Sequence, residues 1–130
     1  MGYSFSSIDA LGEGYGFRKV RRAMGVTAFG VNAIVYPPGQ EGFQHYHELQ
    51  DELYFVHSGR ALFEVVGEER ELGPGGLCHV EATTPRMVSN ASESEDLVLL
   101  VIGGKGGYVE RDGMLVDPER DLTRRQAFGG

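Results

Sequence analysis

Two histidines and a glutamate stand close together in the sequence, at His45, His47 and Glu52. Because one residue separates the histidines, both side chains point to the same face of an extended segment. Glu52 opens the next apolar run, where it shares a face with Tyr54 and Val56 by the same alternation. Two imidazoles and one carboxylate on one inward face form a ligand set for Fe(II), Mn(II), Ni(II) or Zn(II). These residues alone leave a second interpretation open, in which the histidines are surface residues of an acidic loop.

Other polar residues are candidates for the same site. Tyr54 lies on the face of Glu52 and is placed to donate a hydrogen bond or a proton, although a buried tyrosine is more often part of a core. His57 has the opposite parity to Glu52, so we expect it to face outward. Cys78 and His79 follow one another on a predicted strand and face opposite ways, and either one is able to face the site.

Short apolar runs separated by glycine- and proline-rich turns predict the elements that hold these residues. Strands are expected over 26–36, 52–57, 60–66, 69–72, 77–81, 86–89 and 97–102. Asp117-Pro118 resembles a helix N-cap followed by proline at the first helical position, so we expect a short helix over 118–127. Many short strands without a long helical period before residue 117 favour a β-sandwich or β-barrel.

Composition and charge narrow the classes of function. The chain has 130 residues, of which 41% are hydrophobic and 24% charged, as is usual for one globular domain. Its net charge of −7 argues against nucleic acid or an anionic membrane as the main partner. The basic run Arg18-Lys19-x-Arg21-Arg22 is interpreted as a solvated edge strand, where positive charge discourages pairing with another sheet.

The cellular compartment is predicted from cysteine usage and hydropathy. Cys78 is the only cysteine, so no disulfide can form within the chain, which fits a reducing compartment. No stretch has the length of a membrane span, and residues 1–25 lack the apolar core of a secretory signal. We therefore expect a cytoplasmic protein.

The wider spacing around the histidines is similar to the first signature motif of the cupin superfamily. Gly39 is followed after five residues by His45-Tyr46-His47, then after four residues by Glu52, and after six more by Gly59. Glycines, ligand residues and spacing all agree with that motif. The segments 72–76 and 81–90 resemble the turn and the closing strand of the second cupin motif.

This resemblance implies an all-β fold, namely a single-domain cupin-like jelly-roll β-barrel with a short C-terminal helical extension. The whole chain, residues 1–130, would form one domain. Its core barrel would span about residues 18–103, preceded by an N-terminal segment at 1–17 and followed by a C-terminal extension at 104–130.

The second motif departs from the family at Arg86, where a histidine ligand usually stands. Arginine stays protonated in proteins and cannot ligate a metal, so the resemblance implies three metal ligands, His45, His47 and Glu52, instead of four. Three arrangements are open. In the first, the metal binds these three residues and keeps open coordination positions. In the second, Arg86 also anchors an acidic substrate beside the metal. In the third, the guanidinium of Arg86 pairs with Glu52 and replaces the charge of the metal.

Two classes of function fit the resemblance. The first is a metal-dependent enzyme of the dioxygenase, isomerase, decarboxylase or lyase type, in which Arg86 and Tyr54 assist a divalent metal in acting on a small polar or anionic molecule. The alternative is a non-catalytic module, with or without a metal, that binds a small molecule through Arg86. Fold alone does not choose between them, because one architecture hosts many functions.

We also expect a homodimer. The sheet edges and outward apolar residues such as Leu53 and Phe55 would be exposed to solvent in a monomer. The resemblance suggests that a partner chain buries them. The segment 1–22 carries four aromatic residues and is the candidate to pack across that interface.

Overall fold

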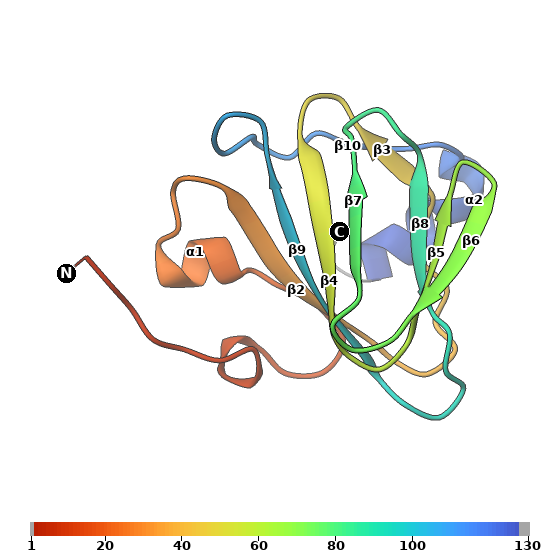
Figure 1. Cartoon of the computed structure of the whole chain (residues 1–130), viewed down its shortest axis with the longest axis horizontal. Coiled ribbons are helices and arrows are strands. Elements are labelled where there is room, and N and C mark those ends of the chain that lie inside the picture. The colour runs from red at the N-terminus through yellow and green to blue at the C-terminus, as the bar shows by residue number, and fades with distance from the viewer. Residues whose placement is uncertain (1, 128–130) are drawn as a thin grey trace.

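Two antiparallel sheets of five strands face each other and form the two halves of a barrel (Figure 1). The structure is a computed structural model and describes residues 2–127. The strand order is β1-β2-β9-β4-β7 in the first sheet and β10-β3-β8-β5-β6 in the second.

The first sheet consists of β1 (Gly16–Arg18), β2 (Gly30–Tyr36), β4 (Asp51–Ser58), β7 (Leu77–Val80) and β9 (Leu97–Gly104). The second sheet consists of β3 (His45–His47), β5 (Ala61–Val65), β6 (Glu68–Leu72), β8 (Arg86–Asn90) and β10 (Gly113–Leu115). The helical elements are the 3-10 turn η1 (Asp9–Leu11), α1 (Val20–Met24) and α2 (Pro118–Ala127).

The core lies between the two sheets, because alternating apolar residues along the strands point their side chains inward. Leu97 and Leu99 of β9 point inward and are 0% exposed, with half-buried residues between them. Val56 of β4 and Phe63 of β5 meet them from either side. Each such side chain contributes about 1.5–3 kcal/mol when it is fully buried. This packing fixes the middle of β4, whose first residues carry Glu52.

The N-terminal part of the chain covers the outer face of β2. Val31 and Ala33 pack there against Val20 of α1. Because successive residues of a strand face opposite ways, Asn32 and Ile34 point inward instead, and both line the interior cavity. Val31 also borders the cavity, so the contact with α1 lies next to the cavity wall.

Most of the predicted elements are confirmed. The fold is all-β, and the helix expected over 118–127 coincides with α2. The strand expected over 26–36 begins only at Gly30. The reason is that Val26 closes the turn after α1, where its N–H donates to the carbonyl of Arg21 at 3.0 Å.

The interpretation of the basic run as a solvated edge strand is wrong: only Arg18 lies on an edge strand, and its side chain is buried. This residue lies on β1 but is 9% exposed, and its guanidinium donates to the carbonyls of Ile8 (2.8 Å) and Gly14 (3.0 Å). Lys19 directly precedes α1, and Arg21 and Arg22 lie on it. A helix of five residues is too short to show a helical period in the sequence, so the pattern did not reveal it.

Apolar side chains remain on the surface. Leu53 and Phe55 are half-buried on β4, while Tyr3 and Phe5 in the N-terminal segment are exposed. The structure describes one chain, so the homodimer stays a prediction.

Among residues 2–127, no helix has both the length and the apolar character that crossing a membrane requires.

Candidate metal centre

The three predicted metal ligands meet at the wall of the barrel interior. His45 and His47 lie on β3, and Glu52 lies near the start of β4. Oε1 of Glu52 is 3.2 Å from Nε2 of His47 and 3.9 Å from Nε2 of His45. One ligand atom from each residue lies within 4.8 Å of the others. Alternation puts His45 and His47 on the same side of β3, and the facing of the two sheets brings them together with Glu52 of β4.

Each imidazole is oriented through its other nitrogen. Nδ1 of His47 lies 2.7 Å from Oδ1 of Asp112, and Nδ1 of His45 lies 3.2 Å from the carbonyl of Phe43. A proton on each Nδ1 donates to these oxygens, which leaves both Nε2 atoms facing Glu52 with a free lone pair. Acceptors of this kind fix the tautomer and the ring orientation of metal-binding histidines.

Asp112 is itself held firmly. It accepts hydrogen bonds from the backbone N–H groups of Leu49 (2.7 Å) and Gln50 (3.1 Å) and from Nε2 of Gln50 (2.7 Å). Gly103, opposite Glu52 in the sheet, makes room for this arrangement, because a Cβ there would collide with the amide oxygen of Gln50. The sequence did not point to Asp112, which lies 65 residues from His47.

Electrostatics favour a positive charge between the two carboxylates. Burial raises the pKa of Glu52, but contact with His45 and His47 lowers it more, and the net pKa is well below the ordinary value. The pKa of Asp112 falls to about 2: burial raises it, and the hydrogen bonds from Gln50, Leu49 and His47 outweigh burial. Both groups are therefore carboxylates at neutral pH. Burial lowers the pKa of His47, but Glu52 and Asp112 raise it more, so the site attracts a proton or a metal ion.

The donor set fits a divalent metal. Nε2 of His47 is buried and has no hydrogen-bond partner among the residues that the structure describes, although Glu52 is nearby. Buried polar atoms are nearly always satisfied, so an orphaned imidazole nitrogen beside a carboxylate needs an explanation. Two imidazoles and one carboxylate with open positions are a known metal-binding set, and a bound ion would satisfy this nitrogen.

Tyr54 contacts the cluster from the same face of β4, as its position predicted. Its hydroxyl donates to Oε1 of Glu52 at 2.8 Å, and its side chain is 3% exposed. Burial and the charge of Glu52 raise the pKa of Tyr54 well above its ordinary value. The phenol therefore stays protonated and acts as a hydrogen-bond donor to the carboxylate.

Arg86 lies next to Glu52 but does not line the cavity. It is 0% exposed; its Nη2 donates to the carbonyl of Glu81 at 3.0 Å, and its Nη1 is 3.9 Å from Oε1 of Glu52. Its Nε and Nη1 have no hydrogen-bond partner among the described residues. The guanidinium thus adds a buried positive charge beside the cluster, and the residues that line the cavity do not include it.

The remaining candidate residues lie outside the cluster. His57 and His79 are exposed, and neither lines the cavity. Cys78 is half-buried and packs against the apolar core, so of the two neighbours Cys78 faces inward and His79 outward.

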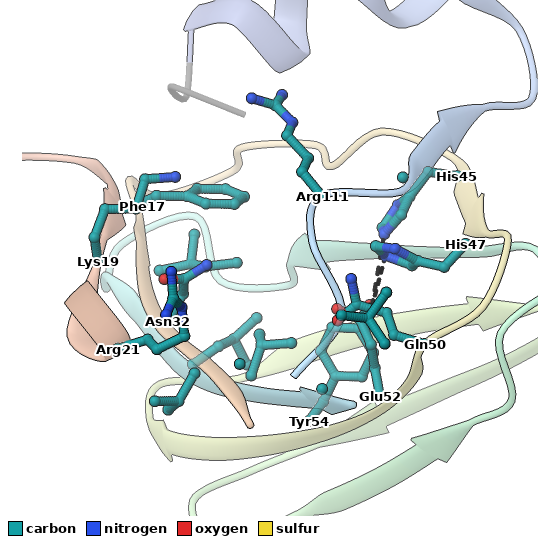
Figure 2. Close-up of a pocket in the computed structure, with 18 of the residues that line it drawn as sticks. Phe17, Lys19, Arg21, Asn32, His45, His47, Gln50, Glu52, Tyr54 and Arg111 are labelled. Atoms are coloured by element: carbon teal, nitrogen blue, oxygen red, sulfur yellow. Dashed lines mark hydrogen bonds and ion pairs between the residues drawn. The ribbon is translucent and has the colours of Figure 1, made fainter. Parts of the chain in front are cut away.

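The cluster opens on a cavity of about 310 Å³, at the small end of the usual range for ligand pockets. Apolar residues such as Ile34, Leu99 and Val101 form its wall, and Gln50 and Asn32 add amide groups. Figure 2 shows His45, His47 and Glu52 on one side of this cavity and Lys19 and Arg21 on the other. The basic residues that line the cavity are Lys19, Arg21, Arg22, Arg111 and Arg125.

Solved structures with the same fold include proteins of several activities. A cupin protein from Bacteroides fragilis matches with a TM-score of 0.69 and 23% identity over 90% of this chain and 96% of that one. A sugar phosphate isomerase of the cupin superfamily from Silicibacter pomeroyi matches with a TM-score of 0.63 and 26% identity over 68% of this chain and 58% of that one. The DMSP lyase DddQ from Ruegeria pomeroyi matches with a TM-score of 0.62 and 25% identity over 72% of this chain and 46% of that one.

This chain thus spans about half the length of the isomerase and lyase chains. No curated protein matches its sequence. Residues 33–103, more than half of the chain, match the family described as the cupin domain. That segment contains β3 and β4 with their three candidate ligands, and the two facing sheets are shared with the solved cupin structures. The chain belongs to the cupin family.

Proposed function

We propose that this protein binds a divalent transition metal through His45, His47 and Glu52 and acts on a small polar or anionic molecule in the adjoining cavity. The observation that carries the proposal is the convergence of three ligand atoms within 4.8 Å, including a buried nitrogen of His47 that has no hydrogen-bond partner among the described residues. Fe, Mn, Ni and Zn all accept two imidazoles and a carboxylate. When bound, such a metal supplies a Lewis acid that polarises a substrate oxygen.

The surrounding residues have separate tasks in this proposal. Asp112 holds His47 in the tautomer that directs Nε2 at the ion, and Tyr54 directs Oε1 of Glu52 by its hydrogen bond. The apolar wall of the cavity limits the water around the reacting group, which strengthens polar interactions there. Isomerase or lyase chemistry, as in the names of two matching cupins, fits such a site.

Arg86 has a different role here from that of a substrate anchor. Its complete burial and its 3.9 Å approach to Glu52 favour an electrostatic role behind the ligand. A permanent cation at this place weakens binding of a divalent ion, because like charges repel strongly where water is excluded. The same contact favours the second candidate function, a metal-free binding module in which Arg86 replaces the charge of the metal.

Metal analysis of the protein purified without a histidine tag tests the proposal. We expect about one divalent ion per chain after incubation with each of the four metals, measured by mass spectrometry of the desalted protein. In parallel, Arg86→His removes the cation and adds a third imidazole as a fourth ligand, so it should bind the metal more tightly. Wild-type protein that stays metal-free while Arg86→His acquires metal would establish the second candidate function. Wild type and variant both metal-free would contradict the ligand assignment.

A further inference from the structure

The positive side chains of this protein divide into two groups. Of its twelve lysines and arginines, seven lie within 4.0 Å of a carboxylate. The other five have no ion pair with any described residue, and all five line the cavity described above. We call them the cationic rim: Lys19, Arg21, Arg22, Arg111 and Arg125.

Three segments far apart in the sequence build this rim. Lys19, Arg21 and Arg22 come from the start of α1, Arg111 from the chain just before β10, and Arg125 from α2. In Figure 2, Lys19 and Arg21 lie beside Asn32 across the cavity from the two histidines, and Arg111 lies between the two sides. The chain as a whole is acidic. Solvation of surface charges therefore does not explain why the cations that lack an ion pair all lie at one cavity.

The rim carries an electrostatic cost in the absence of a ligand. Burial lowers the pKa of Lys19, and the charges of Arg111 and Arg22 lower it further. Glu52, the only carboxylate among the described residues that line the cavity, already contacts His47 and Tyr54. No described acidic group therefore balances the rim, and an anion entering the cavity would relieve the repulsion.

One rim arginine is partly fixed in place before any ligand binds, and another has an unsatisfied nitrogen. The guanidinium of Arg21 stacks on the ring of Tyr108, 3.8 Å from its centroid. Nε of Arg125 is buried and has no hydrogen-bond partner among the described residues. Stacking on an aromatic face leaves the edge N–H groups of a guanidinium free to bind an oxyanion, and less side-chain entropy is then lost on binding.

We propose that the cationic rim binds the phosphate of a small phosphomonoester whose other end reaches the cluster of His45, His47 and Glu52. A single arginine fork satisfies a carboxylate, whereas a phosphomonoester carries nearly two charges and three terminal oxygens and takes several cationic donors. The apolar wall between the rim and the cluster accommodates the uncharged middle of such a molecule. The orientation of the ligand rests on the proposed metal function; phosphate binding at the rim does not.

The test compares rim variants with a matched control. Glycerol phosphate is the probe, glycerol and succinate are the comparison ligands, and affinity is measured by calorimetry. Lys19→Gln, Arg21→Gln and Arg111→Gln should each weaken binding of glycerol phosphate by about tenfold or more. Arg70→Gln removes an equally positive but exposed side chain that pairs with Glu68 outside the cavity, and it should change the affinity by less than about twofold. Arg21→Lys keeps the positive charge but not the planar guanidinium group. Its affinity for glycerol phosphate should therefore lie between those of Arg21→Gln and the wild type.

Metal content measured on the same samples separates this proposal from the previous one. The rim variants should keep the metal stoichiometry of the wild type, and His47→Ala should lose metal while it still binds the phosphate. In the absence of phosphate, Lys19→Gln should melt at a slightly higher temperature than wild type, because the repulsion is reduced. Wild-type protein that binds neither glycerol phosphate nor inorganic phosphate, an equal loss in Arg70→Gln, or tighter binding of succinate would each overturn the phosphate assignment and leave the metal assignment standing.

Discussion

The metal cluster and the cationic rim are built from opposite kinds of sequence. The cluster comes from eight consecutive positions, His45 to Glu52, inside the segment that matches the cupin domain at 33–103. All five rim residues, at 19, 21, 22, 111 and 125, lie outside that segment. The barrel that is common to the family therefore holds the candidate metal site. The segments before and after it determine which other side chains face the cavity.

The two regions also differ in how their charge is balanced. At the cluster, Glu52 and the neighbouring Asp112 are paired with histidines and backbone donors, and the side chain of Glu52 is only 11% exposed. In the rim, Lys19, Arg22 and Arg111 are exposed and lack carboxylate partners among the described residues. We therefore expect metal binding at the cluster to be the more sensitive to single substitutions, and phosphate binding at the rim to be the more sensitive to salt.

The largest effect is expected from removing a ligand of the cluster. His45→Ala or His47→Ala should lower metal affinity by more than about 100-fold, beyond the 10–100-fold typical of losing an outer partner. His57→Ala and His79→Ala, which alter exposed histidines outside the cavity, serve as matched controls and should keep the wild-type metal content. Metal-to-protein ratios after dialysis measure the result. A cluster variant that retained metal like its control would show that these imidazoles are not ligands.

A smaller loss is expected from Asp112→Asn. The amide keeps the shape of the carboxylate but is a weaker acceptor for Nδ1 of His47, so the imidazole is less firmly oriented and less basic. Metal affinity should fall by about 10–100-fold. A competition titration with a chelator measures it, with Asp9→Asn at an exposed site as the control. An unchanged affinity would remove Asp112 from the metal site.

Salt should separate the rim from the cluster. Charges that are open to solvent are screened by ions, and the screening length falls from about 30 Å at about 0.01 M to about 8 Å at about 0.15 M ionic strength. Affinity for glycerol phosphate should fall by roughly tenfold over this range, and metal affinity by much less, because the cluster is buried. Titrations at several chloride concentrations measure both slopes. Equal slopes for the two ligands would contradict the contrast between the regions.

The smallest effect concerns the docking of α2, which carries Arg125. Asp121 is 0% exposed, accepts from the backbone N–H of Gln44 at 3.0 Å and pairs with Arg120 and Arg124. Asp121→Asn should lower the free energy of unfolding by about 1–3 kcal/mol, as measured by urea denaturation. Metal content should not change, whereas phosphate affinity should fall modestly as Arg125 loses its position.

The pH dependence of the same variant has a definite sign. The hydrogen bonds from Arg120 lower the pKa of Asp121, aided by the N–H of Gln44 and opposed by burial. Because the folded-state pKa lies below the unfolded value of about 3.9, Asp121 stabilises the fold fully above about pH 4, and the contribution is lost as the pH falls through the folded-state pKa. The stability difference between wild type and Asp121→Asn should therefore shrink in acid. A constant difference from neutral to acidic pH would contradict this account.

The sequence by itself determined seven of the ten described strands and the candidate residues of the cluster. The one-residue gap in β3 already placed His45 and His47 on one face of their strand, and alternation along β4 placed Glu52 on the face of Tyr54 and Val56, because side-chain direction in a strand depends only on local parity. The proline after Asp117 likewise set the start of α2 at the predicted residue. These features are local, so they were readable without the fold.

Only the tertiary structure decided what surrounds the cluster. Asp112 reaches His47 from 65 residues away, and the rim collects side chains from α1, α2 and the chain before β10. The burial of Arg86 beside Glu52, outside the cavity lining, depends on how β8 lies against β3. Parity and spacing describe neighbours along one strand, whereas these contacts depend on which strands pair and how the terminal segments fold back over the barrel. That pairing is settled by burial of the whole core, a property that no short stretch of sequence carries.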